Sequence, residues 1–177
     1  MACPSERLLK SFKVYPRRVD FNYKLDKFFI YMYLDPFQEL KKAKTFKAGG
    51  TEYCFAYQPI YLGKGTGAGY RQNQHLQAFL KGRENNTYKV KAMEKIRDGI
   101  AKAVAEGDTS KPYNWKEYQE GWIIVLETFN SPKELLKFEM ELIKSIGVQK
   151  DKSGPLANKI TNAYAFDNLS NGIDEIF

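Results

Sequence analysis

"KFFIYMYL", residues 27–34, is the stretch from which the fold can be worked outward. After its lysine every residue is aromatic or aliphatic, and an Asp-Pro pair follows, which is typical of a β-strand that ends in a turn. "EYCFAYQPIYL", residues 52–62, predicts a second strand. Pro59 lies inside it, so this strand is expected at an edge of the sheet or with a bulge. The simplest arrangement pairs the two strands as a hairpin, with residues 35–51 as the connection.

Within that connection, "ELKKAKTFKAGG" (39–50) is polar and predicts a connector with one helical turn and a Gly-Gly turn at its end. "GWIIVLETF" (121–129) predicts a third strand, and its continuous apolar run favours a central position in the sheet. Helical spacing of apolar residues and glycine stops predict three helices, over residues 68–81, 87–107 and 131–147. The sequence therefore predicts an α+β fold in which a small mixed or antiparallel three-stranded sheet is flanked by helices.

Two of these helices carry detailed signals. The helix over 87–107 has an apolar stripe at helical spacing, formed by Val90, Met93, Ile96, Ile100, Ala103 and Val104. The helix over 131–147 has a complete start: Ser131 is the predicted N-cap, Pro132 takes the first helical position, and Glu134 can close a capping box. Glycines follow both helices and predict their ends.

The composition is that of an ordinary globular protein with a basic surface. The chain has 177 residues, with 28 Lys and Arg against 21 Asp and Glu, and a formal net charge of +7. Tyr and Phe number twelve each. Basic and aromatic residues together suit a phosphate backbone with stackable bases, but they suit a merely basic protein equally well. Charge alone does not decide the function.

The cysteines and the hydropathy of the chain indicate its expected cellular location. Cys3 and Cys54 have neither the spacing of a zinc site nor that of a disulfide framework, so a reducing, cytoplasmic environment is expected. No apolar run approaches the roughly 20 residues that a spanning helix needs, and the beginning of the chain has no hydrophobic signal core. We expect no membrane partner.

Glu139 is the most informative single residue. It lies in the apolar stripe of the helix over 131–147, four residues after Leu135 and three before Leu142. A carboxylate that faces a core costs several kcal/mol unless it is paired or binds a metal. One interpretation places Glu139 at the edge of the stripe or in an ion pair with a basic neighbour. The other makes it the ligand of a hard cation, with water and a substrate phosphate completing the shell.

The glycine-rich stretch "PIYLGKGTGAGYRQNQHL" (59–76) does not fit the two common phosphate-binding loops. A P-loop needs Gly five residues before its Gly-Lys pair, and Gln58 occupies that position. The dinucleotide pattern G-x-G-x-x-G fails from either starting glycine, because Ala68 and Tyr70 occupy its last position. The glycines are therefore interpreted as a turn from strand to helix that permits positive φ or a close backbone approach.

Four polar side chains of this stretch are placed to converge. Arg71 and His75 lie at i and i+4 on one helical face, Tyr61 ends the strand before the turn, and Lys64 lies on the loop between them. A phenol, a guanidinium and an imidazole could thus meet near one point. The alternative is ordinary: Tyr61 belongs to the core, Arg71 is solvated, and His75 covers the apolar face of Leu76, Phe79 and Leu80.

These elements, in this order, resemble the GIY-YIG nuclease superfamily. "FIY" (29–31) resembles the first motif at Tyr31, "YLG" (61–63) the second at Tyr61, and "GKG" followed by R-x-x-x-H resembles one branch of the family. "LLKFEMELIKSIG" resembles the helix with the metal-binding Glu, here Glu139, and "GPLANKIT" the element with the later Asn, here Asn158. The resemblance covers roughly residues 27–162.

The chain departs from the family pattern in several places. Phe29 replaces the glycine of the first motif, and Leu62 replaces the isoleucine of the second. Tyr31 and Tyr61 are far apart for the family, so residues 35–57 are interpreted as an insertion that could contact substrate. A separate DNA-binding domain such as homing endonucleases carry is not evident. We accordingly divide the chain into a basic N-terminal extension (1–26) and one nuclease-like domain (27–177).

The resemblance implies an endonuclease that hydrolyses phosphodiester bonds of duplex DNA with Mg²⁺ or Mn²⁺ and leaves 5′-phosphate and 3′-hydroxyl ends. It implies that Tyr31 is a general base or orients the attacking water, with its pKa lowered by nearby cations, and that Glu139 holds the metal. Tyr61 and His75 would hydrogen-bond the nucleophile or a phosphate oxygen. Arg71, with Lys64 beside it, would stabilise developing charge, and Asn158 would orient a phosphate or brace the site.

The sequence is compatible with several other functions. The nuclease could belong to a phage or mobile element, act on branched DNA in repair, or act on RNA. The same basic face could also serve a nucleic-acid-binding domain without catalysis. Arg17 and Arg18 in the N-terminal extension are either solvated or form an arm along the phosphate backbone. The oligomeric state cannot be read from the sequence.

Overall fold

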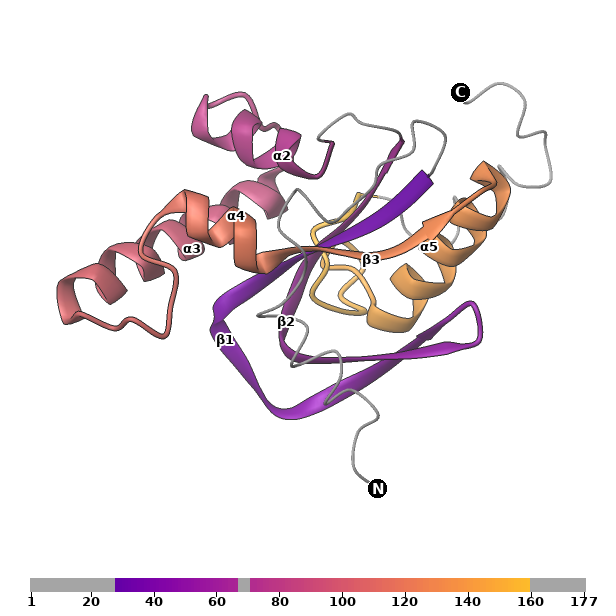
Figure 1. Cartoon of the computed structure of the whole chain (residues 1–177), viewed down its shortest axis with the longest axis horizontal. Coiled ribbons are helices and arrows are strands. Elements are labelled where there is room, and N and C mark those ends of the chain that lie inside the picture. Colours follow the sequence, from indigo (N-terminus) through magenta and orange to yellow (C-terminus); the bar gives the residue numbers. More distant parts are fainter. Residues whose placement is uncertain (1–27, 67–70, 160–177) are drawn as a thin grey trace.

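The computed structural model describes residues 28–66 and 71–159. These residues form an antiparallel three-stranded sheet with helices on both faces, an α+β fold as predicted (Figure 1). The elements are β1 Phe28–Ala48, β2 Thr51–Thr66, α2 Arg71–Leu80, α3 Thr87–Glu106, α4 Trp115–Trp122, β3 Ile123–Phe129 and α5 Pro132–Ile146. The predictions for residues 1–26, including Arg17 and Arg18, lie outside the described residues. Among the described helices, none combines the length and hydropathy needed to cross a membrane.

β1 is the central strand, because the sheet order is β2-β1-β3. The prediction that residues 121–129 form the central strand is therefore wrong: β3 lies at an edge and begins at Ile123, after the unpredicted helix α4. Both faces of β3 are nevertheless covered, so the residues that begin it, Ile123 to Leu126, are all buried. A continuous apolar run indicates a strand that is covered on both faces. It does not indicate whether the strand has one neighbouring strand or two.

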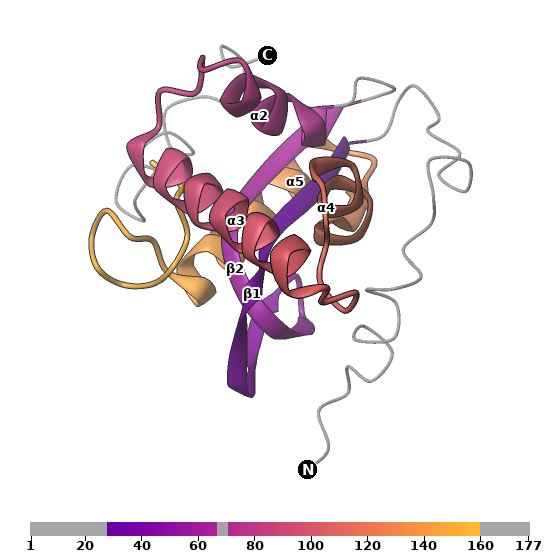
Figure 2. The same cartoon turned by 90° about the vertical axis from the view of Figure 1, so that its left-hand side faces the viewer.

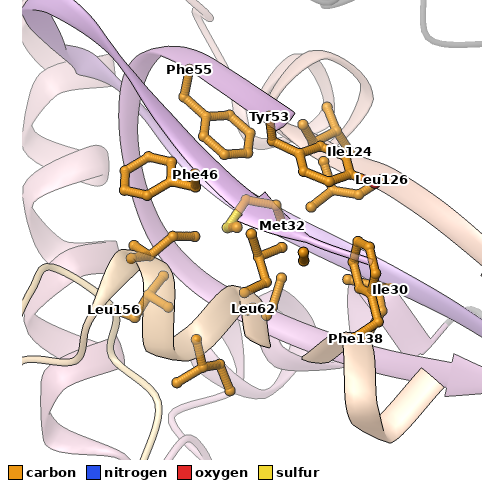
Figure 3. Close-up of a cluster of buried hydrophobic side chains, with 14 of the residues drawn as sticks. Ile30, Met32, Phe46, Tyr53, Phe55, Leu62, Ile124, Leu126, Phe138 and Leu156 are labelled. Carbon is orange, nitrogen blue, oxygen red and sulfur yellow. The ribbon is translucent and has the colours of Figure 1, made fainter. Parts of the chain in front are cut away.

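Alternate side chains of β1 point to two separate cores. Phe29, Tyr31 and Tyr33 pack with residues of α2, α3 and α4. Figures 1 and 2 show these three helices together on one side of the sheet. Ile30, Met32 and Leu34 point to the opposite face, toward α5. Figure 3 shows the second cluster, in which Ile30 and Met32 lie near Leu62 and Phe138. The period-two alternation of strand side chains thus separates an aromatic, hydroxyl-bearing face from a mostly aliphatic one.

The hairpin of β1 and β2 continues through most of the predicted connection. Gly49 and Gly50 form its turn, both with positive φ (57° and 77°), so the Gly-Gly turn is confirmed. The polar connector with a helical turn is wrong, because residues 39–48 belong to β1. Its buried side chains alternate with polar ones: Phe46 lies across from Tyr53 and packs on Phe55 in the core that α5 covers. The interpreted insertion is therefore an extension of the hairpin.

The prediction for Pro59 is confirmed on both counts. β2 is an edge strand, and a register shift separates the Tyr33 pairing from the Leu34–Pro59 pairing. A bulge at this point accommodates a residue that has no backbone N–H to give to the ladder. At its far end the hairpin is fixed to α5, because the Gly49 N–H donates to Glu141 Oε2 over 2.7 Å.

Helix starts and stops agree well with the sequence. Ser131 caps α5 by accepting from the Lys133 N–H over 3.2 Å, and Gly147 ends the helix with a φ of 84°. The helix predicted over 68–81 is described from Arg71 to Leu80. One detail of α3 is wrong: Val104 is 56% exposed, whereas Lys89, at the start of the helix, is buried in line with Met93, Ile96 and Ile100.

Candidate active site

The predicted site residues line one cavity of about 310 Å³ between β2, α2, the start of α3, α5 and the segment after α5. All of those that the resemblance singles out for catalysis border it: Tyr31, Tyr61, Lys64, Arg71, His75, Glu139 and Asn158. Five further residues complete the lining: Glu84, Asn85, Asn86, Lys89 and Lys159. Residues separated by more than one hundred positions thus meet at one place, because the antiparallel hairpin brings β2 beside the ends of the flanking helices.

The two tyrosines reach the cavity from neighbouring strands. Tyr31 pairs with Gly63 across the hairpin, and its ring lies over the glycine backbone, where an added Cβ would overlap the ring. Gly65 accommodates Phe29 in the same way. Gly63 and Gly65 both belong to β2, so the prediction that Lys64 lies on a loop is wrong. The two glycines allow the rings of β1 to lie close to the β2 backbone. The ring centroids of Tyr31 and Tyr61 are 6.3 Å apart.

Burial keeps both phenols protonated. Tyr31 is 1% exposed. Burial, followed by the neighbouring Tyr61 and Tyr33, raises its pKa far above the ordinary value, while Arg71 lowers it only in part. Burial also raises the pKa of Tyr61, to about 12. The expectation that nearby cations lower the pKa of Tyr31 is not met among the described residues, because the effect of Arg71 is smaller than that of burial. These groups are suited to donate or orient hydrogen bonds rather than to take up a proton.

His75 points toward Tyr61, not toward the apolar face of its helix. Its Nε2 lies 3.0 Å from the Tyr61 hydroxyl, and the two rings meet edge to face with centroids 4.8 Å apart. The buried side chain beside it is Leu76. Burial, then the charge of Lys89, lowers the pKa of His75, so the imidazole is neutral at neutral pH. The interpretation of His75 as a cover for the apolar face is therefore wrong.

Two charged residues that the sequence reasoning missed contact this imidazole. Glu84 Oε2 lies 3.1 Å from His75 Nδ1, and Lys89 Nζ lies 2.9 Å from the same nitrogen. Lys89 also contacts Glu84 Oε2 at 3.5 Å and stands 3.9 Å from the centroid of the Tyr61 ring. Burial lowers the pKa of Lys89 to about 8. The signal was available: Lys89 lies in the apolar stripe of α3, as Glu139 does in that of α5.

Asn86 joins this cluster to the end of the described chain. Its side chain caps α3 by accepting from the N–H groups of Tyr88 and Lys89, and its Nδ2 donates to the Ala157 carbonyl over 2.7 Å. The Asn86 N–H donates to Glu84 Oε1 over 3.0 Å. The cap therefore fixes both the first turn of α3, which holds Lys89, and the carboxylate of Glu84.

Glu139 faces the cavity and is 8% exposed. Lys64 Nζ contacts its Oε2 at 3.0 Å, so the sequence-based alternative of a basic partner is realised. The second alternative remains compatible, because one carboxylate at the wall of a polar cavity, beside space for water and a phosphate, suits a magnesium ion. Within residues 28–66 and 71–159, no cluster of three or more His, Cys, Asp or Glu side chains is placed to hold a metal. A metal here would have Glu139 as its protein ligand.

Asn158 braces the wall of the site. It is buried, its Oδ1 accepts from the Leu62 N–H over 3.0 Å, and its Nδ2 donates to the Leu62 carbonyl over 2.7 Å. Both polar ends of the amide are thus used by the backbone of β2 between Tyr61 and Gly63. Of the two roles that the resemblance implies for Asn158, these contacts favour the bracing role.

The cavity has an excess of positive charge. Lys64, Arg71, Lys89 and Lys159 contribute four cations, against the two carboxylates of Glu84 and Glu139. Arg71 is exposed at the rim, where its Nη1 donates to Gln74 Oε1 over 2.8 Å. Such a charge distribution attracts an anion with several oxygen acceptors, and a guanidinium at the rim suits a phosphate group.

Comparison of the chain with family models, with curated proteins and with solved structures yields no match.

Proposed function

We propose that this chain is a metal-dependent endonuclease of the GIY-YIG type that hydrolyses phosphodiester bonds of DNA. The observation that carries the proposal is the convergence of two phenols, an imidazole, a guanidinium and a buried carboxylate on one cavity with excess positive charge. Each of these groups has a role in phosphodiester hydrolysis, in which negative charge accumulates on the phosphoryl oxygens while water loses a proton.

In the proposed mechanism, Glu139 would hold Mg²⁺ or Mn²⁺, which when bound supplies Lewis-acid stabilisation of phosphate charge. Arg71 donates from the rim to phosphoryl oxygens, and Lys64 adds positive charge beside Glu139. Tyr31 orients the attacking water, a role that its burial and raised pKa favour over that of a general base. Asn158 keeps the β2 backbone, and with it Tyr61, in position.

The direct test is a plasmid-nicking assay with Mg²⁺ or Mn²⁺ and with EDTA. Supercoiled DNA should be nicked by the wild-type chain only with metal, and Glu139→Ala should abolish nicking, because the cavity loses its metal ligand. The matched control is Glu134→Ala, which removes an exposed carboxylate from the first turn of the same helix. Nicking by Glu139→Ala at the wild-type rate would refute the assignment.

The contact of Lys64 with Glu139 favours a second candidate, a nucleic-acid-binding domain without catalysis, because an ammonium already neutralises the carboxylate. Such a domain would bind DNA or RNA with EDTA present and cleave neither with any divalent metal. Duplex DNA, single strands, branched DNA and RNA, tested side by side for binding and cleavage, would separate this candidate from the nuclease and identify the substrate class.

A further inference from the structure

Glu84 contacts the imidazole of His75 at one defined nitrogen. Its Oε2 lies 3.1 Å from His75 Nδ1, which is hydrogen-bond distance, and its side chain is 7% exposed. Burial raises the pKa of Glu84, but the Asn86 N–H and the charge of Lys89 lower it, and the pKa lies below its ordinary value. The carboxylate is therefore ionised at neutral pH and can only accept, so the hydrogen between the two groups belongs to Nδ1.

Lys89 does not compete for this position. Its Nζ lies 2.9 Å from Nδ1 but also 3.5 Å from Nε2 of His75, and it stands 3.9 Å from the centroid of the Tyr61 ring. A donor in line with the lone pair of Nδ1 would lie much farther from Nε2, because the two nitrogens point to different sides of the ring. The ammonium therefore lies beside the face of the imidazole, as it does beside that of Tyr61. The in-plane position at Nδ1 is left to Glu84.

The hydrogen on Nδ1 decides the direction of the next hydrogen bonds. A neutral imidazole carries one hydrogen, so Nε2 can only accept, and the Tyr61 hydroxyl, 3.0 Å away, donates to it. Tyr61 has a single hydroxyl hydrogen, so its oxygen accepts from the Tyr31 hydroxyl, to which it is hydrogen-bonded. The hydrogen bonds thus run in one direction, from Tyr31 to Glu84.

We propose that Glu84 is a positioning residue that holds His75 in its Nδ1–H tautomer and thereby makes the Tyr31 oxygen an acceptor for a hydrogen of the attacking water. Tyr31 lines the cavity, and its own hydrogen is engaged by Tyr61, so it offers a lone pair to a water molecule there. The identity of that water as the nucleophile rests on the proposed nuclease function; the direction of the hydrogen bonds does not.

Both oxygens of Glu84 are fixed by the surrounding chain. Glu84 lies between α2 and α3, where its Oε1 accepts from the Asn86 N–H over 3.0 Å. Asn86 is itself fixed, because its side chain caps α3 and donates to the Ala157 carbonyl. Oε2 meets Lys89 Nζ at 3.5 Å. A buried ion pair brings little or no net stability relative to apolar residues of the same size, so this placement favours a role in orienting the imidazole over a role in stability alone.

The test uses NMR on the ligand-free, untagged full chain at pH 7, where the single histidine of the sequence gives one set of imidazole signals. Long-range proton–nitrogen correlations report which ring nitrogen carries the hydrogen. The wild type should show the Nδ1–H tautomer. Glu84→Ala should show Nε2–H, because Nδ1 has then lost its acceptor while the Tyr61 oxygen can still accept from Nε2. An Nε2–H tautomer or a fully protonated ring in the wild type, or an unchanged Nδ1–H tautomer in Glu84→Ala, would overturn the proposal.

Two further variants separate Glu84 from its surroundings. Lys89→Met, recorded above the pKa of its imidazole, should keep the Nδ1–H tautomer, and a switch to Nε2–H there would assign control to Lys89 and contradict the proposal. Glu106→Ala removes an exposed carboxylate from the other end of α3 and should leave the imidazole signals unchanged. A change in that control would show that the tautomer responds to total charge and not to the contact. If Glu84→Ala does not fold, the wild type and Lys89→Met still decide.

Cleavage kinetics give the second measurement. Glu84→Ala should lower kcat by about 10- to 100-fold with little change in KM, the loss typical when an outer group that orients the ligand of a metal site is removed. A switched tautomer with unchanged kcat would refute the catalytic part of the proposal. If the wild type itself cleaves no nucleic acid, the proposed function fails, whereas the NMR comparison still decides the hydrogen-bond direction.

Discussion

At the residue scale, the chain places single charged groups inside otherwise apolar stripes. Glu139 in α5 and Lys89 in α3 both occupy positions where helical spacing calls for a hydrophobic side chain, and both face the cavity. A buried charge destabilises a fold unless it has partners, and here each charge has one: Lys64 for Glu139 and Glu84 for Lys89. A charge in an apolar stripe is thus a signal of the site that can be found before the structure is known.

Arg71 permits a prediction at this scale. Because the guanidinium lies at the rim and can donate to phosphoryl oxygens, Arg71→Ala should lower kcat by about 100-fold or more, the cost of losing a charge-stabilising donor. Arg71→Lys should retain part of the activity, since it keeps the charge but not the planar fork. The measurement is steady-state cleavage of a short DNA duplex.

The control for Arg71 is Arg83→Ala, an exposed arginine after α2 that lines a different groove. It should leave kcat unchanged. If Arg71→Ala instead raises KM at constant kcat, Arg71 contributes equally to the ground state and the transition state, and its role is substrate binding alone.

At the scale of elements, the hairpin of β1 and β2 is the framework of the site. Tyr31, Tyr61 and Lys64 all come from its two strands. The absence of a side chain at Gly63 lets the Tyr31 ring lie directly against the β2 backbone. Asn158 and Asn86 then join the hairpin and α3 to the segment after α5 through backbone hydrogen bonds. The site is thus built on the hairpin and on the hydrogen bonds of Asn158 and Asn86, which hold the segment after α5 against β2 and α3.

Gly63→Ala tests this framework. The added methyl would overlap the Tyr31 ring, which is almost fully buried and cannot move without displacing its neighbours. We expect a loss of roughly 1–3 kcal/mol in the free energy of unfolding, typical of overpacking, together with reduced cleavage as the Tyr31 hydroxyl is displaced. Urea denaturation and plasmid nicking measure the two effects.

Gly121→Ala is the matched control, because Gly121 lies in α4 and an added Cβ meets no atom within 4 Å. It should leave cleavage unchanged and, as a glycine-to-alanine change in a helix, should not lower stability. Equal destabilisation of the two variants would contradict the close fit at Gly63.

At the scale of the whole molecule, charges from several elements act on one another in the cavity, so activity should depend on pH through Lys89. The charged and titratable groups around it are Glu84, His75, Tyr61, Arg71 and Lys159. Because the pKa of Lys89 is lowered to about 8, its ammonium loses its proton as the pH rises through 8. The cavity then loses one of its four cations, so its attraction for a phosphate weakens and kcat/KM for DNA cleavage should fall above pH 8.

The stability contribution of Lys89 has the opposite sign. Between pH about 8 and the ordinary lysine value of 10.5, the unfolded chain binds the proton that the folded chain has released. The contribution of Lys89 to the free energy of unfolding should therefore rise with pH in this window. Wild type and Lys89→Met, compared by urea denaturation and by cleavage from pH 6 to 10, should differ in both slopes. Parallel profiles for the two proteins would contradict the lowered pKa of Lys89.

Sequence alone determined the local features, because they depend on residues close together in the chain. The N-cap at Ser131, the glycine stops, the Gly-Gly turn, the edge or bulge at Pro59 and the buried position of Glu139 all follow from spacing and backbone preference. The α+β class follows from three strand-like runs and three helical stripes. The order of short motifs also indicated the residues that line the cavity.

Only the tertiary structure decided what depends on contacts between distant segments. The extension of the hairpin through residues 39–48, the central place of β1 and the formation of α4 were not predicted, because apolar alternation and burial there come from packing against α5 and the sheet. The partners of His75 were likewise decided by the fold, since Glu84 and Lys89 reach it only when α3 packs beside α2. Local spacing fixes which face a side chain is on, and the packing of elements fixes which charge it meets there.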